Sequence, residues 1–192
     1  MTETQHLGTA SPATVGGGDR LRLFCGLTLP GHVLDLLAEW QERELRGGRI
    51  VRRENLHVTL AFLGSRPAAD AGRVAAELGA AAAATREAIR LRSRSYRETR
   101  SVGMLVLDDD GARASRLATD VHERLERLRV YQRERRPWLP HVTVLRFRRP
   151  PRLCPALPDL GEFSPSGVAV YHSLLRPGGA RYEVLQSFAL GG

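Results

Sequence analysis

Apolar residues recur along this chain with two spacings, one typical of strands and one typical of helices. Alternation, or a short apolar run closed by Gly or Pro, predicts strands at residues 21–29, 49–52, 56–63, 89–96, 101–107, 140–147, 167–175 and 181–190. Apolar positions three or four residues apart predict helices at residues 32–45, 68–85 and 112–128. Residues 148–166 are rich in Pro and are expected to be irregular.

The predicted order of elements is β-α-β-β-α-β-β-α-β-β-β. Several consecutive strands are joined by short turns, which favours an α+β fold with antiparallel sheets over a doubly wound parallel sheet. Each half of the chain contributes strand–helix–strand material. We therefore expect two lobes related by a pseudo-twofold axis, with antiparallel sheets lining a central cleft and helices on the outside.

One tripeptide occurs twice inside these predicted strands, as His57-Val58-Thr59 and as His141-Val142-Thr143. Side chains alternate between the two faces of a strand, so each His points the same way as the Thr two residues later. Two such strands side by side would aim two imidazoles and two hydroxyls into one cleft. That set suits acid/base chemistry on a phosphate without a metal. The alternative is a pair of half-buried strand histidines that hydrogen-bond to neighbouring hydroxyls.

Length and composition indicate a soluble globular protein. The 192 residues are 42% hydrophobic and 26% charged, which suits a single bilobal domain at residues 20–192. Residues 1–19 are polar, lack the apolar core of a secretory signal and are expected to form a disordered tail. No apolar run is long enough to cross a membrane, so no membrane association is expected.

The net charge is +8 and all 29 basic residues are Arg. A GC-rich genome accounts for the excess itself, but guanidinium groups bind phosphates and stack on bases, which favours a nucleic-acid or nucleotide substrate. Cys25 and Cys154 form no evident disulfide framework, so reduced thiols in the cytoplasm are expected. No His/Cys/Asp cluster with metal-ligand spacing and no phosphate-binding Gly-rich loop is present in the sequence, so no metal and no cofactor are expected.

Four stretches of the sequence, at residues 21–27, 54–64, 140–146 and 171–183, carry a family resemblance. With its two His-x-Thr motifs and a closing Pro-Gly-x-x-x-Tyr hairpin, the chain resembles the two-histidine (2H) phosphoesterase superfamily. It is most similar to the RNA 2′,3′-cyclic phosphodiesterases, formerly called 2′-5′ RNA ligases. The second motif continues with Val144-Leu145 where the family more often has Leu-Ala, a change between apolar pairs. The resemblance implies the bilobal 2H phosphoesterase fold and metal-independent hydrolysis of RNA 2′,3′-cyclic phosphodiester ends.

The resemblance also implies roles for the motif residues. His57 would donate a proton to the leaving O3′, and His141 would accept one from water, so that a 2′-phosphomonoester is released. Thr59 and Thr143 would bind the non-bridging phosphate oxygens. An imidazole has an ordinary pKa near 6.5, so a neutral and a protonated copy can coexist near neutrality. The motif pair is symmetric in sequence, however, and the residues themselves do not reveal which His is the acid.

Three further residues have two interpretations each. Arg146 lies five positions after His141, so strict alternation puts it on the opposite face, as a solvated charge at the strand end. The family has Arg at this position near the phosphate, which would require strand twist or a bulge. Phe24 and Tyr182 are either core aromatics or platforms for base stacking.

The other histidines match neither motif. His172 is expected to be structural or exposed. His6, His32 and His122 are expected to be solvated.

Two alternatives stay open for the function. The same site would also serve a nucleotide-level cyclic phosphodiesterase, or reversible 2′-5′ RNA ligation with a 5′-hydroxyl in place of water. A different class of function is a non-catalytic module that binds RNA or nucleotides in a basic cleft. In each case the expected partner is RNA or a nucleotide, with a 2′,3′-cyclic phosphate for the enzymes, and the protein is expected to be a monomer.

Overall fold

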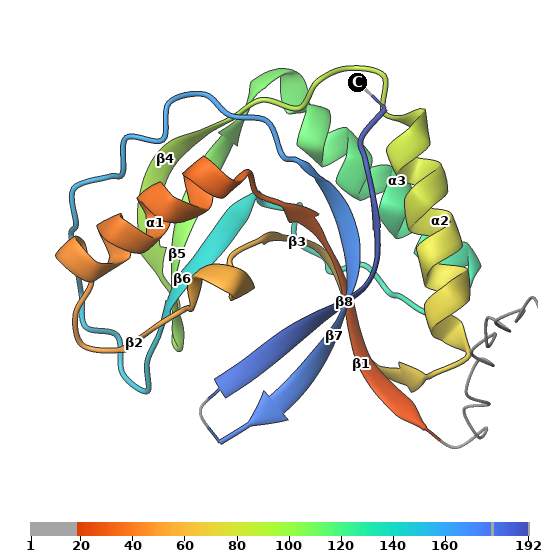
Figure 1. The fold of residues 1–192 in the computed structure, drawn as a ribbon, viewed down its shortest axis with the longest axis horizontal. Helices are drawn as coiled ribbons and strands as arrows, with labels where there is room; N and C mark the ends of the chain where they lie inside the picture. The colour runs from red at the N-terminus through yellow and green to blue at the C-terminus, as the bar shows by residue number, and fades with distance from the viewer. Residues whose placement is uncertain (1–18, 178, 192) are drawn as a thin grey trace, which may run out of the picture.

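The computed structural model describes residues 19–177 and 179–191, and its elements follow the predicted order (Figure 1). The strands and helices are β1 (Arg20–Thr28), α1 (Gly31–Glu44), β2 (Arg49–Ile50), β3 (Val58–Pro67), α2 (Asp70–Ala84), β4 (Leu91–Glu98), β5 (Val102–Asp109), α3 (Arg113–Arg127), β6 (His141–Arg146), β7 (Gly167–Arg176) and β8 (Gly179–Phe188). Single 3₁₀ turns, η1 (Arg53–Asn55) and η2 (Asp110–Ala112), precede β3 and α3. The tail predicted at residues 1–19 lies outside the described residues except for Asp19.

The strands form one eight-stranded antiparallel sheet rather than two separate sheets. Their order is β4-β5-β6-β3-β1-β7-β8, with β2 paired to β6. At the centre of the described sheet, β3 and β6 pair through the single residue pair Val58–Val142. The sheet is thus nearly divided into two halves, β2-β4-β5-β6 and β3-β1-β7-β8, which diverge from this junction (Figure 1). The predicted two-lobed α+β architecture with antiparallel strands is confirmed.

The helices cover the outside of the two halves. Helix α1 lies on the β4-β5-β6 half, where Trp40 meets Tyr96 edge-on with ring centroids 6.4 Å apart. Helices α2 and α3 pack against each other and against β3, and α2 also packs against β7 and β8. One continuous cluster of buried apolar side chains runs through both halves. No helix within residues 19–177 and 179–191 is long and apolar enough to cross a membrane.

Strand β3 begins later and ends later than its apolar pattern predicts. The pattern closes at Gly64, but the strand continues to Pro67. Gly64 has a φ of +71° and lies where the pairing of β3 with β1 shifts register. A glycine at positive φ produces a bulge here, so the strand bends without ending.

The acidic turn before α3 has a structural role. The Asp109 carboxylate accepts hydrogen bonds from the backbone N–H groups of Ala114 (2.9 Å) and Ser115 (2.8 Å) and from the Ser115 hydroxyl (2.7 Å). These N–H groups lie in the first turn of α3, where backbone N–H groups have no acceptors within the helix. The carboxylate therefore caps the helix, and its charge is favourable at the positive end of the helix dipole.

Candidate active site

The two His-x-Thr motifs lie side by side on the central strands. Val58 pairs with Val142 in antiparallel register, and both side chains are fully buried on the helix-covered face. In that register His57 stands opposite Thr143, and Thr59 stands opposite His141, all on the other face. The two His residues are then diagonal neighbours, about 7–8 Å apart. The alternation predicted from sequence therefore brings all four side chains together.

Both imidazoles are held through the same ring nitrogen. His57 Nδ1 lies 2.8 Å from the Asn55 carbonyl oxygen, and His141 Nδ1 lies 2.8 Å from the Leu139 carbonyl oxygen. A carbonyl oxygen only accepts, so each Nδ1 carries the hydrogen and each Nε2 is left for chemistry. His57 Nε2 is 3.0 Å from the Thr59 hydroxyl, which donates to it when the ring is neutral.

An aromatic wall surrounds His57. Its ring centroid is 4.8 Å from that of Phe24, 5.3 Å from that of Tyr182 and 5.6 Å from that of Tyr171. Burial lowers the pKa of His57 to about 4, against a smaller upward effect of the hydrogen bond to Asn55. Electrostatic interactions with His141 and Arg146 lower this pKa further. In the free protein His57 is therefore neutral at pH 7.

A cavity of about 340 Å³ opens beside the motifs. His57, Thr59 and Thr143 line it, together with four arginines, Arg22, Arg49, Arg146 and Arg176. None of the described residues that line it is Asp or Glu. His141 is not part of this lining, but it lies opposite Thr59 and its charge acts on His57. Such a cavity favours an anion, and its hydroxyls and guanidinium groups are suited to phosphate oxygens.

Arg146 reaches the cleft because β6 contains a bulge. On β5, the consecutive residues Gly103 and Met104 pair with Leu145 and Thr143, so Val144 is an extra residue on β6. Val144 and Leu145 are both fully buried. The extra residue reverses the alternation and returns the Arg146 side chain to the face of Thr143. Strict alternation is therefore the wrong guide at this position.

Strand β3 has an equivalent bulge that the sequence interpretation missed. Gly26 and Cys25 pair with Thr59 and Ala61, which leaves Leu60 as the extra residue. Phe62 is thereby returned to the cleft face, five residues after His57, as Arg146 is five residues after His141. The shared spacing His-x-Thr-x-x-Phe and His-x-Thr-x-x-Arg is the sequence signal that identifies both positions.

The two aromatic residues considered for base stacking differ in accessibility. Phe24 is 3% exposed and is stacked on Tyr171 with centroids 4.7 Å apart and planes inclined by 10°. Its faces are occupied, so it supports His57 and offers no surface to a base. Tyr182 lines the cavity and is partly exposed, and its ring meets Phe24 edge-on at 4.8 Å. Tyr182 is thus the one of this pair that a base can reach.

The prediction that His122 is solvated is wrong. The residue is 7% exposed on α3, and its Nε2 lies 2.8 Å from the carbonyl oxygen of Leu60, the bulged residue of β3. The carbonyl must accept, so Nε2 carries the hydrogen. The bond gives the carbonyl of the bulged residue a hydrogen-bond donor. His32 is exposed, as predicted, and His172 is partly buried on β7.

A side chain from the loop before β6 forms a hydrogen bond to the first motif. Trp138 Nε1 donates to the Thr59 carbonyl oxygen at 2.9 Å. Three residues later the same segment enters β6 at His141. Because β3 and β6 pair so briefly in the described sheet, this bond is a second link between the motifs. Trp138 therefore acts as a positioning residue.

Replacing Trp138 with Phe keeps a ring and removes the N–H donor. We expect kcat to fall about tenfold, because Thr59 loses the bond that fixes its strand against His141. Trp40→Phe is a matched control, since Trp40 Nε1 donates to the Ala156 carbonyl oxygen at 2.6 Å outside the cleft. Both variants should lower the melting temperature. An unchanged kcat in Trp138→Phe, or an equal loss in the control, would contradict the positioning role.

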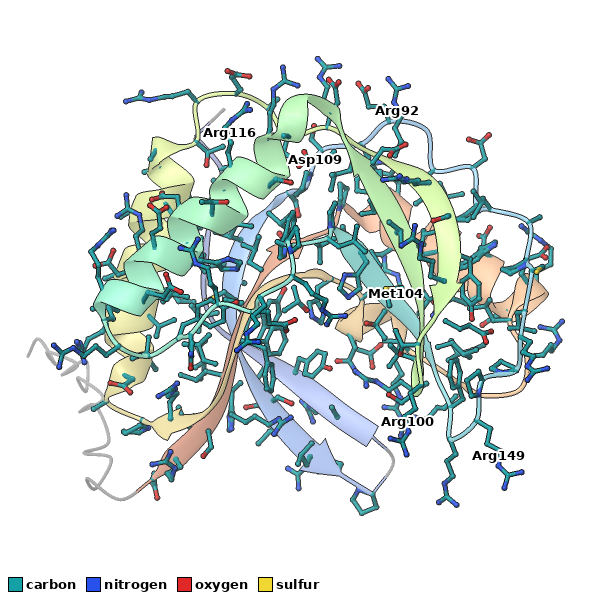
Figure 2. All side chains as sticks on the ribbon, turned by 180° about the vertical axis from the view of Figure 1, so that it is seen from behind. Arg92, Arg100, Met104, Asp109, Arg116 and Arg149 are labelled. Carbon is teal, nitrogen blue, oxygen red and sulfur yellow. The ribbon has the colours of Figure 1, made fainter. Side chains whose placement is uncertain are left out.

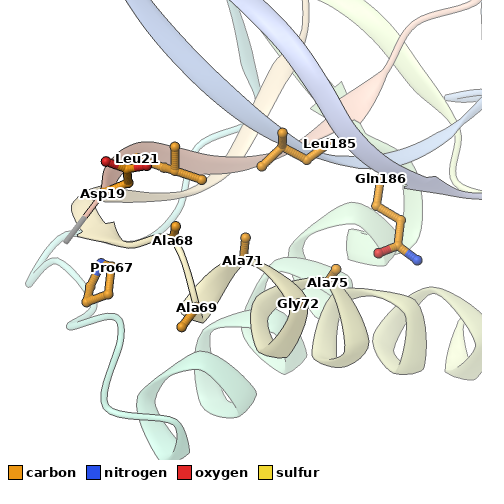
Figure 3. Close-up of a pocket in the computed structure, with 10 residues that line it drawn as sticks. All are labelled: Asp19, Leu21, Pro67, Ala68, Ala69, Ala71, Gly72, Ala75, Leu185 and Gln186. Atoms are coloured by element: carbon orange, nitrogen blue, oxygen red, sulfur yellow. The ribbon is translucent and has the colours of Figure 1, made fainter. Parts of the chain in front are cut away.

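A larger cavity, of about 440 Å³, lies between the start of α2, β1 and β8 (Figure 3). Its lining is mostly small or apolar residues, with Asp19 and Gln186 at opposite ends in the view of Figure 3. No candidate site residue lines it. Across the described residues, no group of three or more His, Cys, Asp or Glu side chains is arranged to hold a metal ion.

Arginine side chains are spread over the whole surface. In Figure 2, Arg92 and Arg116 lie at the end where α3 begins, and Arg100 and Arg149 lie at the opposite end. Several arginines outside the cleft are paired with carboxylates, such as Arg92 with Glu162 at 2.7 Å. The net charge alone therefore does not locate the site. The cavity that four arginines and no described carboxylate line does locate it.

Comparisons with known proteins agree with this geometry. A family model described as LigT like Phosphoesterase matches residues 27–100. The chain is 34% identical over 189 residues to an RNA 2′,3′-cyclic phosphodiesterase of Thermus thermophilus, covering 90% of this chain and 91% of that protein.

Solved structures share the fold. The crystal structure of TT0787 of Thermus thermophilus superposes with a TM-score of 0.75 at 32% identity, over 90% of this chain and 99% of that one. Escherichia coli LigT complexed with 3′-AMP superposes with a TM-score of 0.76 at 22% identity, over 91% and 100%. At that identity the second likeness concerns the fold alone.

Proposed function

This chain belongs to the LigT-like phosphoesterases, and from that premise we propose that it hydrolyses the 2′,3′-cyclic phosphodiester ends of RNA to 2′-phosphomonoesters. One observation carries the proposal. Two His-x-Thr motifs on neighbouring strands put both imidazoles and both hydroxyls on one face of the sheet, beside a cationic cleft that His57, Thr59 and Thr143 line. The Thermus thermophilus relative, which covers nearly the whole chain, is named an RNA 2′,3′-cyclic phosphodiesterase, which supports the same class of substrate.

In the proposed reaction, water attacks phosphorus in line with the ribose O3′. His141 accepts a proton from the water as the new P–O bond forms. His57 donates its Nε2 proton to O3′ as the P–O3′ bond breaks, which leaves the phosphate on O2′. Thr59, Thr143 and Arg146 bind the non-bridging oxygens and stabilise the charge that grows on them.

The pKa of His57 in the free site limits when this residue can act as the proton donor. His57 has its pKa lowered to about 4, so it does not carry the required proton at pH 7 before substrate binds. A bound phosphodiester places a negative charge beside the ring and offsets the positive charge of Arg146. Substrate binding thus raises the pKa of His57 and prepares it to donate.

The lowered pKa of His57 predicts the pH range in which the reaction is fastest. A general acid must be protonated to donate, and with a pKa of about 4 little of the free His57 carries that proton at pH 7. We therefore expect kcat/KM, which reports the free enzyme, to be highest on the acid side of neutrality and to decline as the pH rises above it. The profile would be measured with a cyclic-phosphate oligonucleotide, and the circular dichroism spectrum would be recorded at each pH to exclude unfolding. A kcat/KM that is highest on the alkaline side of neutrality would contradict the lowered pKa of His57.

Product analysis tests the proposed activity itself. A short RNA that ends in a 2′,3′-cyclic phosphate would be incubated with the protein, with and without a chelator. We expect a 2′-phosphate end at the same rate in both samples. A 3′-phosphate end would contradict the direction of cleavage, and a loss of activity on chelation would contradict the metal-independent mechanism. Binding without any product would leave a non-catalytic module as the function.

A second sample with an added 5′-hydroxyl RNA tests ligation, which reverses the same displacement.

The monomeric state and the cytoplasmic location stay predictions of the sequence. The thiols of Cys25, which is buried, and Cys154, which is exposed, are both free.

A further inference from the structure

Two large apolar side chains are exposed inside the cationic cleft. Phe62 on β3 is 49% exposed and Leu175 on β7 is 71% exposed, and both line the cavity that holds His57 and Arg146. Apolar surface that lies open beside a binding site is typical of a ligand contact. The proposed reaction uses neither side chain.

Phe62 already carries a stacked cation. The Arg22 guanidinium carbon lies 4.7 Å from the centroid of the Phe62 ring, over its face. Within the described part of the chain Arg22 forms no ion pair with a carboxylate, and none lines the cavity. A flat aromatic ring and a planar guanidinium are the groups on which proteins stack unpaired bases.

The position of Phe62 separates it from the phosphate. On β1, Phe24 pairs with Phe62 of β3 and Gly26 pairs with Thr59 of β3. Phe62 and Thr59 therefore lie two β1 residues apart, or about 7 Å along the strand. A phosphate held by Thr59 and Arg146 cannot itself reach the ring. A cyclic phosphate closes the 3′ end of an RNA, so the chain continues from it only in the 5′ direction. Tyr182 lies beside His57, within reach of the terminal base.

We propose that Phe62, Arg22 and Leu175 form a stacking platform for the base of the penultimate nucleotide, the one on the 5′ side of the cyclic-phosphate nucleotide. This inference rests on the proposed function and narrows its substrate to RNA ends of at least two nucleotides. Stacking accepts every base, so the platform selects for chain length and not for sequence. Arg22 and Arg176 supply positive charge for the intervening phosphate.

The test compares a mononucleoside 2′,3′-cyclic phosphate with a dinucleotide that ends in the same group. We expect the wild type to favour the dinucleotide in kcat/KM. Phe62→Ala should lower the ratio of the two kcat/KM values about tenfold, the effect of losing one stacked base. Phe62→Tyr, which keeps the ring, should restore the ratio. Leu157→Ala removes a comparably exposed apolar side chain (42%) that does not line the cavity and should leave the ratio unchanged.

Other outcomes overturn the platform. An unchanged ratio in Phe62→Ala would show that the ring does not sense the second nucleotide, and an equal loss for both substrates would assign Phe62 to folding or to the phosphate site. If the wild type hydrolyses neither substrate, the proposed function fails, and binding measurements then test the platform. Phe62→Ala must then weaken binding of a dinucleotide 2′-phosphate about tenfold more than binding of a nucleoside 2′-phosphate. Equal weakening would reject the platform.

Discussion

Replacing His57 or His141 with Ala should lower kcat for a cyclic-phosphate RNA end at least a hundredfold. Each imidazole moves one proton in the proposed displacement, and general acid or base catalysis is commonly worth two to four powers of ten. The paired motifs give neither residue a substitute, because the opposite groups in the register are the hydroxyls of Thr143 and Thr59. KM should change less than kcat, since Thr59, Thr143 and Arg146 still bind the phosphate.

The double variant separates a cooperating pair from two independent contacts. Residues that act as a unit are not additive, so His57→Ala with His141→Ala should cost little more than either change alone. His32→Ala is the control, because His32 is exposed on α1 and does not line the cleft. Circular dichroism should be the same for all variants. Near-normal turnover in either single variant would eliminate the two-histidine mechanism.

Much of this arrangement is readable from periodicity. Strong apolar patterns fix the existence and order of the strands and helices, and alternation within each motif puts His and Thr on one face. The register Val58–Val142 then brings the motifs together. What the sequence does not contain is the pairing itself, because β3 and β6 are far apart along the chain and their register depends on the whole sheet.

The departures from the sequence interpretation share one physical cause. A bulge adds one residue without changing the apolar character of a strand, so a period of two misplaces everything beyond it. This happens after Thr59 and again after Thr143, and it decides the faces of Phe62 and Arg146. The side chains that donate to the Leu60 and Thr59 carbonyls beside the first bulge come from distant segments: His122 from α3 and Trp138 from the loop before β6. No local pattern indicates those partners.

The two halves of the site are alike in backbone and different in surroundings. Each imidazole is held by a carbonyl two residues earlier, and each motif is followed by a bulge. The environment of His57 is an aromatic wall that lowers its pKa to about 4. The bulge after the second motif presents a cation, Arg146, where the bulge after the first presents a ring, Phe62. A symmetric scaffold thus yields an asymmetric site, and the proposals above assign its cationic side to the phosphate and its aromatic side to a base.

Arg146→Ala should lower kcat/KM about a hundredfold. The guanidinium is exposed within the cavity beside Thr143, where the bulge in β6 directs it. Removing one donor to the charge that develops in a transition state typically costs two to three powers of ten. The change also removes a positive charge that lowers the pKa of His57, so this pKa should rise in the variant.

Arg146→Lys distinguishes charge from geometry. An ammonium keeps the charge but loses the planar two-donor grip, so this variant should recover only part of the lost activity. Arg149→Ala is the matched control, because Arg149 projects into solvent three residues beyond the strand position of Arg146 (Figure 2). If Arg149→Ala and Arg146→Ala reduced kcat/KM equally, the loss would reflect the general basic surface. A selective loss in Arg146→Ala would instead tie activity to the one arginine that the bulge turns toward both motifs.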